Sequence, residues 1–170
     1  MTESQAENLK KASEDEMYGK LRMYAMRLVR NYALAEEFTQ ETYLRLWEEK
    51  ETKHKTVQNE RAWLYQTIRN MIFDFLRRQK KLKEIFMHLS ATTRDSIPEQ
   101  ASAAAEQKED EEMLMQKLDQ LSERHREAVR LKFQEKLTFD EMAIVMGESR
   151  STVSRLIAEA IQKLREMMNA

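Results

Sequence analysis

The chain has 170 residues, of which 41% are hydrophobic and 35% charged, with a formal net charge of -1 at neutral pH. Two glycines and one proline are too few for the turns of a sheet protein, so we expect an all-α fold. No run approaches the roughly 20 apolar residues of a membrane span, and the polar N-terminus lacks the apolar stretch of a signal peptide.

The first half of the chain predicts a disordered or frayed tail over residues 1–14 and then two helices. Apolar residues recur at helical spacing over residues 17–29. Asn31 is a candidate N-cap for a second helix over residues 33–47, in which Leu46 and Trp47 are available to the interior. Its other face carries Glu36, Glu37, Gln40 and Glu41. From spacing alone, a solvated face is the preferred interpretation of these four residues.

A polar connector over residues 48–60 reads as a surface loop, and a long helix then begins with RAWLYQTIRNMIFDFLRRQKKLK. Seven basic residues lie between Arg61 and Lys83 against one acid, Asp74. Aromatic rings interleaved with cations can stack on unpaired bases while the cations follow the backbone. The alternative is that Trp63 belongs to the core and the lysines solubilise a helix end, where their charge suits the dipole. The pattern alone does not decide between them.

Residues 84–110 contain Pro98, small residues and an acidic end, and are predicted to be a linker to a second domain over residues 111–170. Ser122 is a candidate N-cap there. Thr138 and Glu141 form a T-x-x-E capping box, and Gly147 suits the left-handed end of a short helix. The pattern indicates a helix-turn-helix.

The second helix of this motif is expected to begin after a Ser149 cap. Its inner face carries Val153, Ile157, Ile161 and Leu164, and its outer face carries Arg150, Ser151, Ser154 and Arg155. Arg and small hydroxyl residues near a helix N-terminus suit phosphate and base contacts in a major groove. A plain αα-hairpin is the alternative, because capped helical hairpins are common in all-α proteins.

The sequence contains no pattern typical of a catalytic or metal site. Absence of cysteine excludes disulfides and thiolate ligands and fits a reducing cytosol. Glu51 and His54 form one E-x-x-H, whereas di-iron bundles need two such motifs and further carboxylates. Neither a Gly-rich phosphate loop nor a nucleophile-base arrangement is visible. We therefore expect no metal, no cofactor and no enzymatic activity.

Three segments together resemble bacterial RNA polymerase sigma factors of the extracytoplasmic-function type, the two-domain group IV. AEEFTQETYLRLW resembles the family's region 2.2, RAWLYQTIRNMIFDFLRR resembles regions 2.3 to 2.4, and LSERHREAVRLKFQEKLTFDEMAIVMG resembles region 4 up to the turn. The resemblance covers about residues 17–83 and 111–166, in the family's order and with a linker between. It implies a region 2-like domain over residues 15–83 and a region 4-like domain over residues 111–170.

The resemblance implies a cytoplasmic protein that binds core RNA polymerase and directs promoter-specific initiation, without a small-molecule substrate. The implied partners are the clamp of the largest polymerase subunit, the flap of the second largest, promoter DNA and an anti-sigma protein. Glu36, Glu37, Gln40 and Glu41 fall where the family meets the clamp. Candidates for the minus-10 element are Asn59, Trp63, Tyr65, Arg69, Asn70, Arg77 and Arg78. Candidates for the minus-35 element are Arg150, Ser151, Ser154 and Arg155.

The chain departs from the family pattern in two places. Glu60 replaces an apolar residue often seen before R-A-W-L, which leaves the loop's shape open. After the turn the family often reads T-V-K-S-R-L-H-R-A-R, whereas here several cations are missing and Glu159 adds a negative charge. Because phosphate contacts supply much of DNA affinity, we predict weak minus-35 binding by this domain alone. Leu44 and Trp47 are expected mainly to pack inside, with a contribution to the polymerase interface as the alternative.

Three functions compete on this sequence. A promoter-directing sigma factor explains both domains, and the depleted recognition helix motivates the alternative of a sigma-like decoy that binds core or an anti-sigma protein without initiating. An ordinary helix-turn-helix repressor explains the second domain only. The acidic linker and basic helix also raise the hypothesis of a compact free state that hides both binding faces.

Overall fold

A computed structural model describes residues 3–52, 56–89 and 117–169, and these ranges contain helices and no strand. The N-terminal half consists of α1 (Glu3–Val29), α2 (Tyr32–Trp47), the π-helical turn η1 (Glu48–Thr52) and α3 (Glu60–Leu89). The C-terminal half consists of α5 (Glu123–Val129), the π-helical turn η2 (Arg130–Gln134), α6 (Phe139–Met146) and α7 (Arg150–Asn169). The expected all-α fold with a helix-turn-helix, α6 and α7, is confirmed. None of the described helices is long and apolar enough to cross a membrane.

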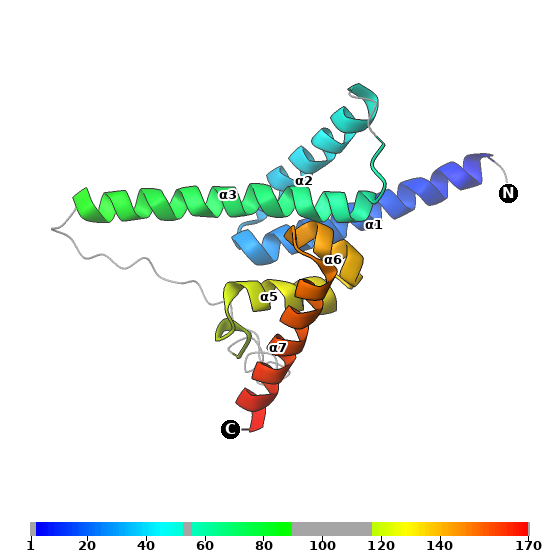
Figure 1. Cartoon of the computed structure of the whole chain (residues 1–170). Coiled ribbons are helices and arrows are strands. Elements are labelled where there is room, and N and C mark those ends of the chain that lie inside the picture. Colours follow the sequence, from blue (N-terminus) through cyan, green and yellow to red (C-terminus); the bar gives the residue numbers. More distant parts are fainter. Residues whose placement is uncertain (1–2, 53–55, 90–116, 170) are drawn as a thin grey trace, which may run out of the picture.

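The N-terminal half packs α1, α2 and α3 against one another (Figure 1). Asn31 caps α2 as predicted, because its Oδ1 accepts a hydrogen bond from the Leu34 amide at 3.0 Å. Helix α1 already begins at Glu3, where the sequence predicted a disordered or frayed tail. Residues 3–14 contain neither glycine nor proline and are rich in strong helix formers, which accounts for the difference.

The buried face of α2 differs from the prediction. It consists of Ala35, Thr39, Thr42 and Leu46. The hydroxyls of Thr39 and Thr42 each donate to a carbonyl one turn earlier at 2.7 Å, so both side chains are buried with their polar groups satisfied. Leu44 and Trp47 are 59% and 60% exposed, so their predicted packing was wrong. The short threonines and alanine let α2 approach its neighbours closely and turn these larger residues outward.

In the C-terminal half, α5, α6 and α7 begin after the predicted caps Ser122, Thr138 and Ser149, and α6 ends at Gly147 as predicted. In the capping box, the Thr138 amide donates to Glu141 at 2.8 Å and the Glu141 amide donates to the Thr138 hydroxyl at 3.2 Å. Gly147 has φ +66°, and the Ser149 hydroxyl accepts from the Thr152 amide at 3.1 Å. Of the expected inner face of α7, Val153 and Ile157 are buried, whereas Ile161 is 37% exposed and lines a groove with Phe133.

The two halves are packed together. Helix α6 lies against α3, while α7 runs away from α3 (Figure 1). One continuous apolar cluster contains Ile68 and Ile72 of α3 together with Leu137, Met142 and Val145 of the other half. The two halves are therefore compact in the described residues, with α3 and α6 packed directly against each other.

The hypothesis that this state hides both binding faces is not met, because Glu37 of α2 and Arg150 of α7 are exposed. Residues 84–89, the first part of the predicted linker, continue α3 instead. The rest of the linker, 90–110, and residues 111–116 of the predicted second domain lie outside the described residues.

Candidate nucleic-acid interface

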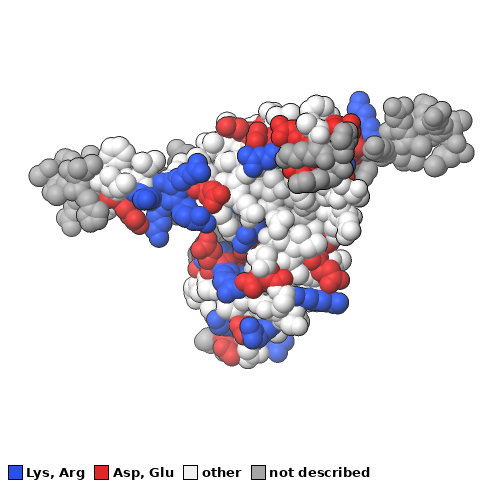
Figure 2. All heavy atoms as spheres, turned by 45° about the horizontal axis from the view of Figure 1, so that its top comes forward, with Lys and Arg blue, Asp and Glu red and all other residues white. Residues whose placement is uncertain are grey.

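Helix α3 presents two groups of candidate DNA-binding residues. Arg61, Tyr65 and Arg69 recur every four residues and so lie on one face, which is turned toward the C-terminal half. The later part of the helix exposes Arg77, Arg78, Lys80, Lys81 and Lys83. Figure 2 shows Lys and Arg gathered toward this end of α3. The predicted DNA surface is thus open at one end and covered at the other.

Tyr65 is fully buried. Its hydroxyl donates to Oε2 of Glu135 at 2.8 Å, and its ring packs edge-on against that of Tyr24 at a centroid distance of 5.2 Å. Burial and the neighbouring Glu135 carboxylate raise the pKa of the Tyr65 phenol. In this arrangement the ring predicted to stack on a base is held inside the protein.

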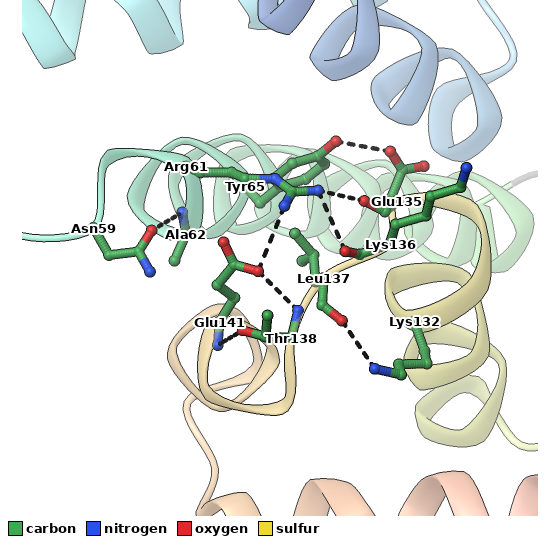
Figure 3. Close-up of polar contacts among 10 residues, drawn as sticks. All are labelled: Asn59, Arg61, Ala62, Tyr65, Lys132, Glu135, Lys136, Leu137, Thr138 and Glu141. Atoms are coloured by element: carbon green, nitrogen blue, oxygen red, sulfur yellow. Dashed lines mark hydrogen bonds and ion pairs between the residues drawn. The ribbon is translucent and has the colours of Figure 1, made fainter.

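The Arg61 guanidinium lies over the end of η2 (Figure 3). Its Nη2 donates to the carbonyl of Glu135 at 2.6 Å and to that of Lys136 at 3.5 Å, and its Nη1 lies 3.6 Å from the Glu141 carboxylate. A cation at this position suits the partial negative charge of unpaired carbonyls at a helix C-terminus. Arg61 therefore links α3 to the first helix of the helix-turn-helix.

Arg69 makes a two-pronged ion pair with the buried Glu127 of α5. Nη2 donates to Oε2 at 3.0 Å, and Nε donates to Oε1. Desolvation acts to lower the pKa of Arg69, but the hydrogen bonds and charge of Glu127 outweigh it, and the pKa is raised. The guanidinium carbon also lies 4.6 Å from the centre of the Phe73 ring. Arg69 is therefore held in place by both an ion pair and an aromatic ring.

The other minus-10 candidates are arranged differently. Asn59 caps α3, its Oδ1 accepting from the Ala62 amide at 3.0 Å. Trp63 is half-buried and lines, with Asn70, a hollow of about 450 Å³ beside η1. Exposed Arg77 pairs with Asp74 at 3.1 Å. Trp63 thus combines packing with an open edge, so neither sequence interpretation of it is complete.

The acidic face of α2 divides into an inward and an outward part. The Glu36 carboxylate accepts from the Tyr18 hydroxyl at 2.6 Å and from Arg22 at 3.3 Å. These contacts, the Tyr18 hydrogen bond above all, lower the pKa of Glu36. Glu37, Gln40 and Glu41 line a groove of about 480 Å³; within it the Gln40 amide donates to Glu36 at 3.2 Å and Glu41 pairs with Arg45 at 2.8 Å. Leu44 and Arg78 also line that groove.

Arg150, Ser151, Ser154 and Arg155 are all exposed on the first turns of α7. Arg150 lies 3.6 Å from Asp140 and Arg155 lies 3.8 Å from Glu159. Glu159 is also held at 3.0 Å by Nε2 of the buried His125, and this hydrogen bond is the main reason its pKa is lowered. The unexpected acid on α7, Glu159, therefore has a partner inside its own domain.

Sequence reasoning missed the residues that join the halves. Besides Glu127 and Glu135 these are Arg27, whose Nη1 lies 2.6 Å from Glu135, and Gln66, whose amide donates to the Ile144 carbonyl at 2.7 Å. The only signal in the sequence was Glu135, which stands shortly before the Thr138–Glu141 capping box. Helical periodicity does not mark such a glutamate as an interdomain contact. The described residues include no cluster of potential metal ligands.

Comparison with known proteins identifies both halves. Residues 15–82 match Sigma-70 region 2, and residues 118–166 match Sigma-70, region 4. The chain is 32% identical over 159 residues to the ECF RNA polymerase sigma factor SigL of Mycobacterium tuberculosis, covering 92% of this chain and 87% of that protein. It is 26% identical over 147 residues to the ECF RNA polymerase sigma factor SigM of Bacillus subtilis, covering 86% of each chain.

A solved structure shares the fold. It is the sigma factor RpoE in complex with the anti-sigma factor NepR from Bartonella quintana, with a TM-score of 0.62 and 21% identity over 94% of this chain and 96% of that one. The expected arrangement of two helical domains is therefore confirmed. The chain belongs to the extracytoplasmic-function family of RNA polymerase sigma factors.

Proposed function

We propose that this sigma factor binds core RNA polymerase mainly through Glu37, Gln40 and Glu41 of α2, with Glu36 holding α2 in position against α1. The observation that carries the proposal is the division of the acidic face: three of its residues line an open groove, while the Glu36 carboxylate is held by Tyr18 and Arg22. An acidic and amide surface facing a basic helical partner favours orientation and association rate. Exposed Leu44, in the same groove, adds apolar contact.

We further propose that α3 binds the melted minus-10 strand and α7 contacts the minus-35 duplex. Exposed cations at the end of α3 follow the sugar-phosphate backbone, while Trp63 and Asn70, which share a hollow, contact bases. Capture of an extruded base offsets part of the cost of unpairing. On α7, Arg150, Ser151, Ser154 and Arg155 form a small exposed set that positions the protein. The protein acts in the cytoplasm and performs no chemical step.

An apolar groove of about 560 Å³ between α5, η2 and α7 is the proposed site for the flap of the second-largest polymerase subunit. Phe133, Ile161, Leu164 and Met168 line it. Phe133 and Met168 are 55% and 67% exposed, and large apolar side chains gathered at the surface are typical of an interaction site. We propose that an anti-sigma protein, where one is present, competes for these polymerase-binding surfaces.

Run-off transcription with purified core polymerase and genomic promoter fragments tests the proposal. The wild-type chain is expected to produce discrete transcripts, and the double variant Glu37→Lys, Glu41→Lys is expected to lose them together with core binding while its helix content stays unchanged. Gln162→Lys, an exposed substitution on α7, is the control for added positive charge. Normal competition for core by the double variant would contradict the α2 assignment.

The decoy function gains support from one observation, the occupation of Arg61, Tyr65 and Arg69 by the other half of the chain. The same experiment separates it from initiation. Core binding without any specific transcript would favour the decoy.

A further inference from the structure

The contacts that join the two halves fall on residues proposed to bind DNA. We define the interdomain clasp as Glu127 and Glu135 with their partners Arg27, Arg61, Tyr65 and Arg69. The members of each contact lie 58 to 108 residues apart in the chain. We propose that the clasp is an intramolecular competitor of promoter DNA: the Glu127 carboxylate at Arg69 and the backbone carbonyl of Glu135 at Arg61 occupy the places that DNA phosphates take, so the closed form and the DNA-bound form exclude each other. This inference rests on the proposed DNA-binding role of α3.

The geometry around Glu135 positions it for this role. It follows η2, where its amide donates to the Arg130 carbonyl at 3.1 Å, and it precedes Lys136, whose φ of +54° is uncommon for a residue other than glycine. This turn directs both the carboxylate and the carbonyl of Glu135 at α1 and α3 (Figure 3). A backbone held in a sparsely populated conformation costs free energy, and such residues cluster at functional sites and switches.

The ligand chemistry of the clasp is that of an anionic strand. Arg61 and Arg69 are eight residues apart, about 12 Å along the helix axis, and each meets an oxygen acceptor of the C-terminal half. Arginine forks bind carboxylate and phosphate with the same two-pronged geometry. The buried Tyr65 between them offers a ring for base stacking once Glu135 leaves.

The α5 part of the interface is suited to opening, whereas the α6 part packs apolar side chains against α3. Beside the Arg69–Glu127 pair lie two hollows of about 420 and 300 Å³, both lined by Phe73, Leu76, Glu123 and Glu127. Helix α5 thus meets α3 through charged side chains and open space more than through close packing. A buried ion pair gains little net free energy because both charges lose water. A DNA strand supplies several phosphates and a base stack at once, and can therefore replace the clasp.

The test uses the full chain, which contains no cysteine, so dyes can be attached at Ala33→Cys and Lys163→Cys in opposite halves. The probe is fluorescein-labelled oligothymidylate for binding, and energy transfer between other dyes reports separation of the halves. We expect oligothymidylate to lower energy transfer in the wild type. The double variant Glu127→Gln, Glu135→Gln is expected to show lower energy transfer than the wild type before DNA is added. It is also expected to bind oligothymidylate about tenfold more tightly. The control Glu148→Gln, which loses a pair with Arg124 inside one half, should behave as the wild type.

A locked chain provides a second test that keeps every clasp charge. Gln66→Cys and Ile144→Cys, at partly exposed positions that share a 2.7 Å hydrogen bond, are joined with a short bismaleimide. The locked chain is expected to bind oligothymidylate at least tenfold more weakly than the same variant left unjoined. Equal binding by the two, or oligothymidylate binding without a change in energy transfer in the wild type, would overturn the inference.

Failure of the proposed function gives a different result. The double variant Arg77→Ala, Arg78→Ala changes exposed residues outside the clasp. It should weaken oligothymidylate binding without changing energy transfer in the free protein. If this variant binds less well but Glu127→Gln with Glu135→Gln binds no better than wild type, α3 binds DNA and the clasp does not compete. If Arg77→Ala with Arg78→Ala has no effect, the DNA-binding role of α3 is itself wrong.

Discussion

Tyr65→Phe removes one oxygen atom from the centre of the clasp and leaves the ring in place. The lost hydroxyl is buried and donates to the Glu135 carboxylate at 2.8 Å. A hydrogen bond to a charged group contributes about 1.5–3 kcal/mol. Glu135 keeps its 2.6 Å pair with Arg27, so its charge is not left without a partner and the lower part of that range applies. The ratio of closed to open protein should therefore fall about tenfold.

Energy transfer between the dyes at residues 33 and 163, followed against sodium chloride concentration, measures this ratio. The midpoint of opening should move to lower salt in Tyr65→Phe, while binding of oligothymidylate should become tighter because phenylalanine still stacks on bases. Tyr18→Phe is the matched control, since it removes a hydroxyl bonded to Glu36 within the N-terminal half and should leave the midpoint unchanged.

A double-mutant cycle with Glu135→Gln then isolates the contact. Because the two side chains touch directly, their effects on the opening free energy should be non-additive by at least about 0.5 kcal/mol. Additive effects, or an unchanged midpoint in Tyr65→Phe, would show that the hydroxyl does not hold the halves together and would refute the reasoning.

Further predictions concern stability and the charge of α7. Thr138→Ala breaks the capping box and should lower the free energy of unfolding in urea by about 1 kcal/mol, with Thr138→Ser close to wild type; equal losses in both would contradict the capping role. Val153→Ala leaves a cavity at a fully buried position and should cost about 2 kcal/mol, against almost nothing for exposed Gln162→Ala. Glu159→Lys should steepen the salt dependence of duplex binding by the full chain in gel shifts; an unchanged slope would place α7 away from DNA. Burial and the Glu36 hydrogen bond raise the pKa of Tyr18 from 10.0 to about 12, so its contribution to stability is complete below pH 10 and is lost as pH rises through about 12. Alkaline unfolding curves of wild type and Tyr18→Phe should converge over that interval, and parallel curves would count against the contact.

Helix boundaries set by caps were predictable because the interactions that set them are local, whereas the start of α1 and the end of α3 were not. The Asn31 cap, the Thr138–Glu141 capping box and the Gly147 turn each involve residues within a few positions of one another, and all three occur as predicted. The family could also be recognised from the sequence, because three motifs in a characteristic order are more specific than any single helix. The exposed polar face of α7 followed from helical periodicity.

Periodicity failed where small polar residues replaced large apolar ones. In α2 it favoured Leu46 with Trp47, whereas the buried face uses Thr39 and Thr42, whose hydroxyls bond to their own helix. A pattern of apolar residues does not show that a threonine can be buried without cost when its own backbone accepts its proton.

The sequence by itself determined the helices, their caps, the two charged faces and the family of this protein. Only the tertiary structure decided which of the charged residues are open to a partner. Glu135 meets Arg27, Arg61 and Tyr65 because two halves fold onto one another, and no local spacing relates an acid to a helix 70 residues away. The physical reason is that hydrogen bonds of caps close within a turn, whereas ion pairs across an interface depend on how apolar faces dock.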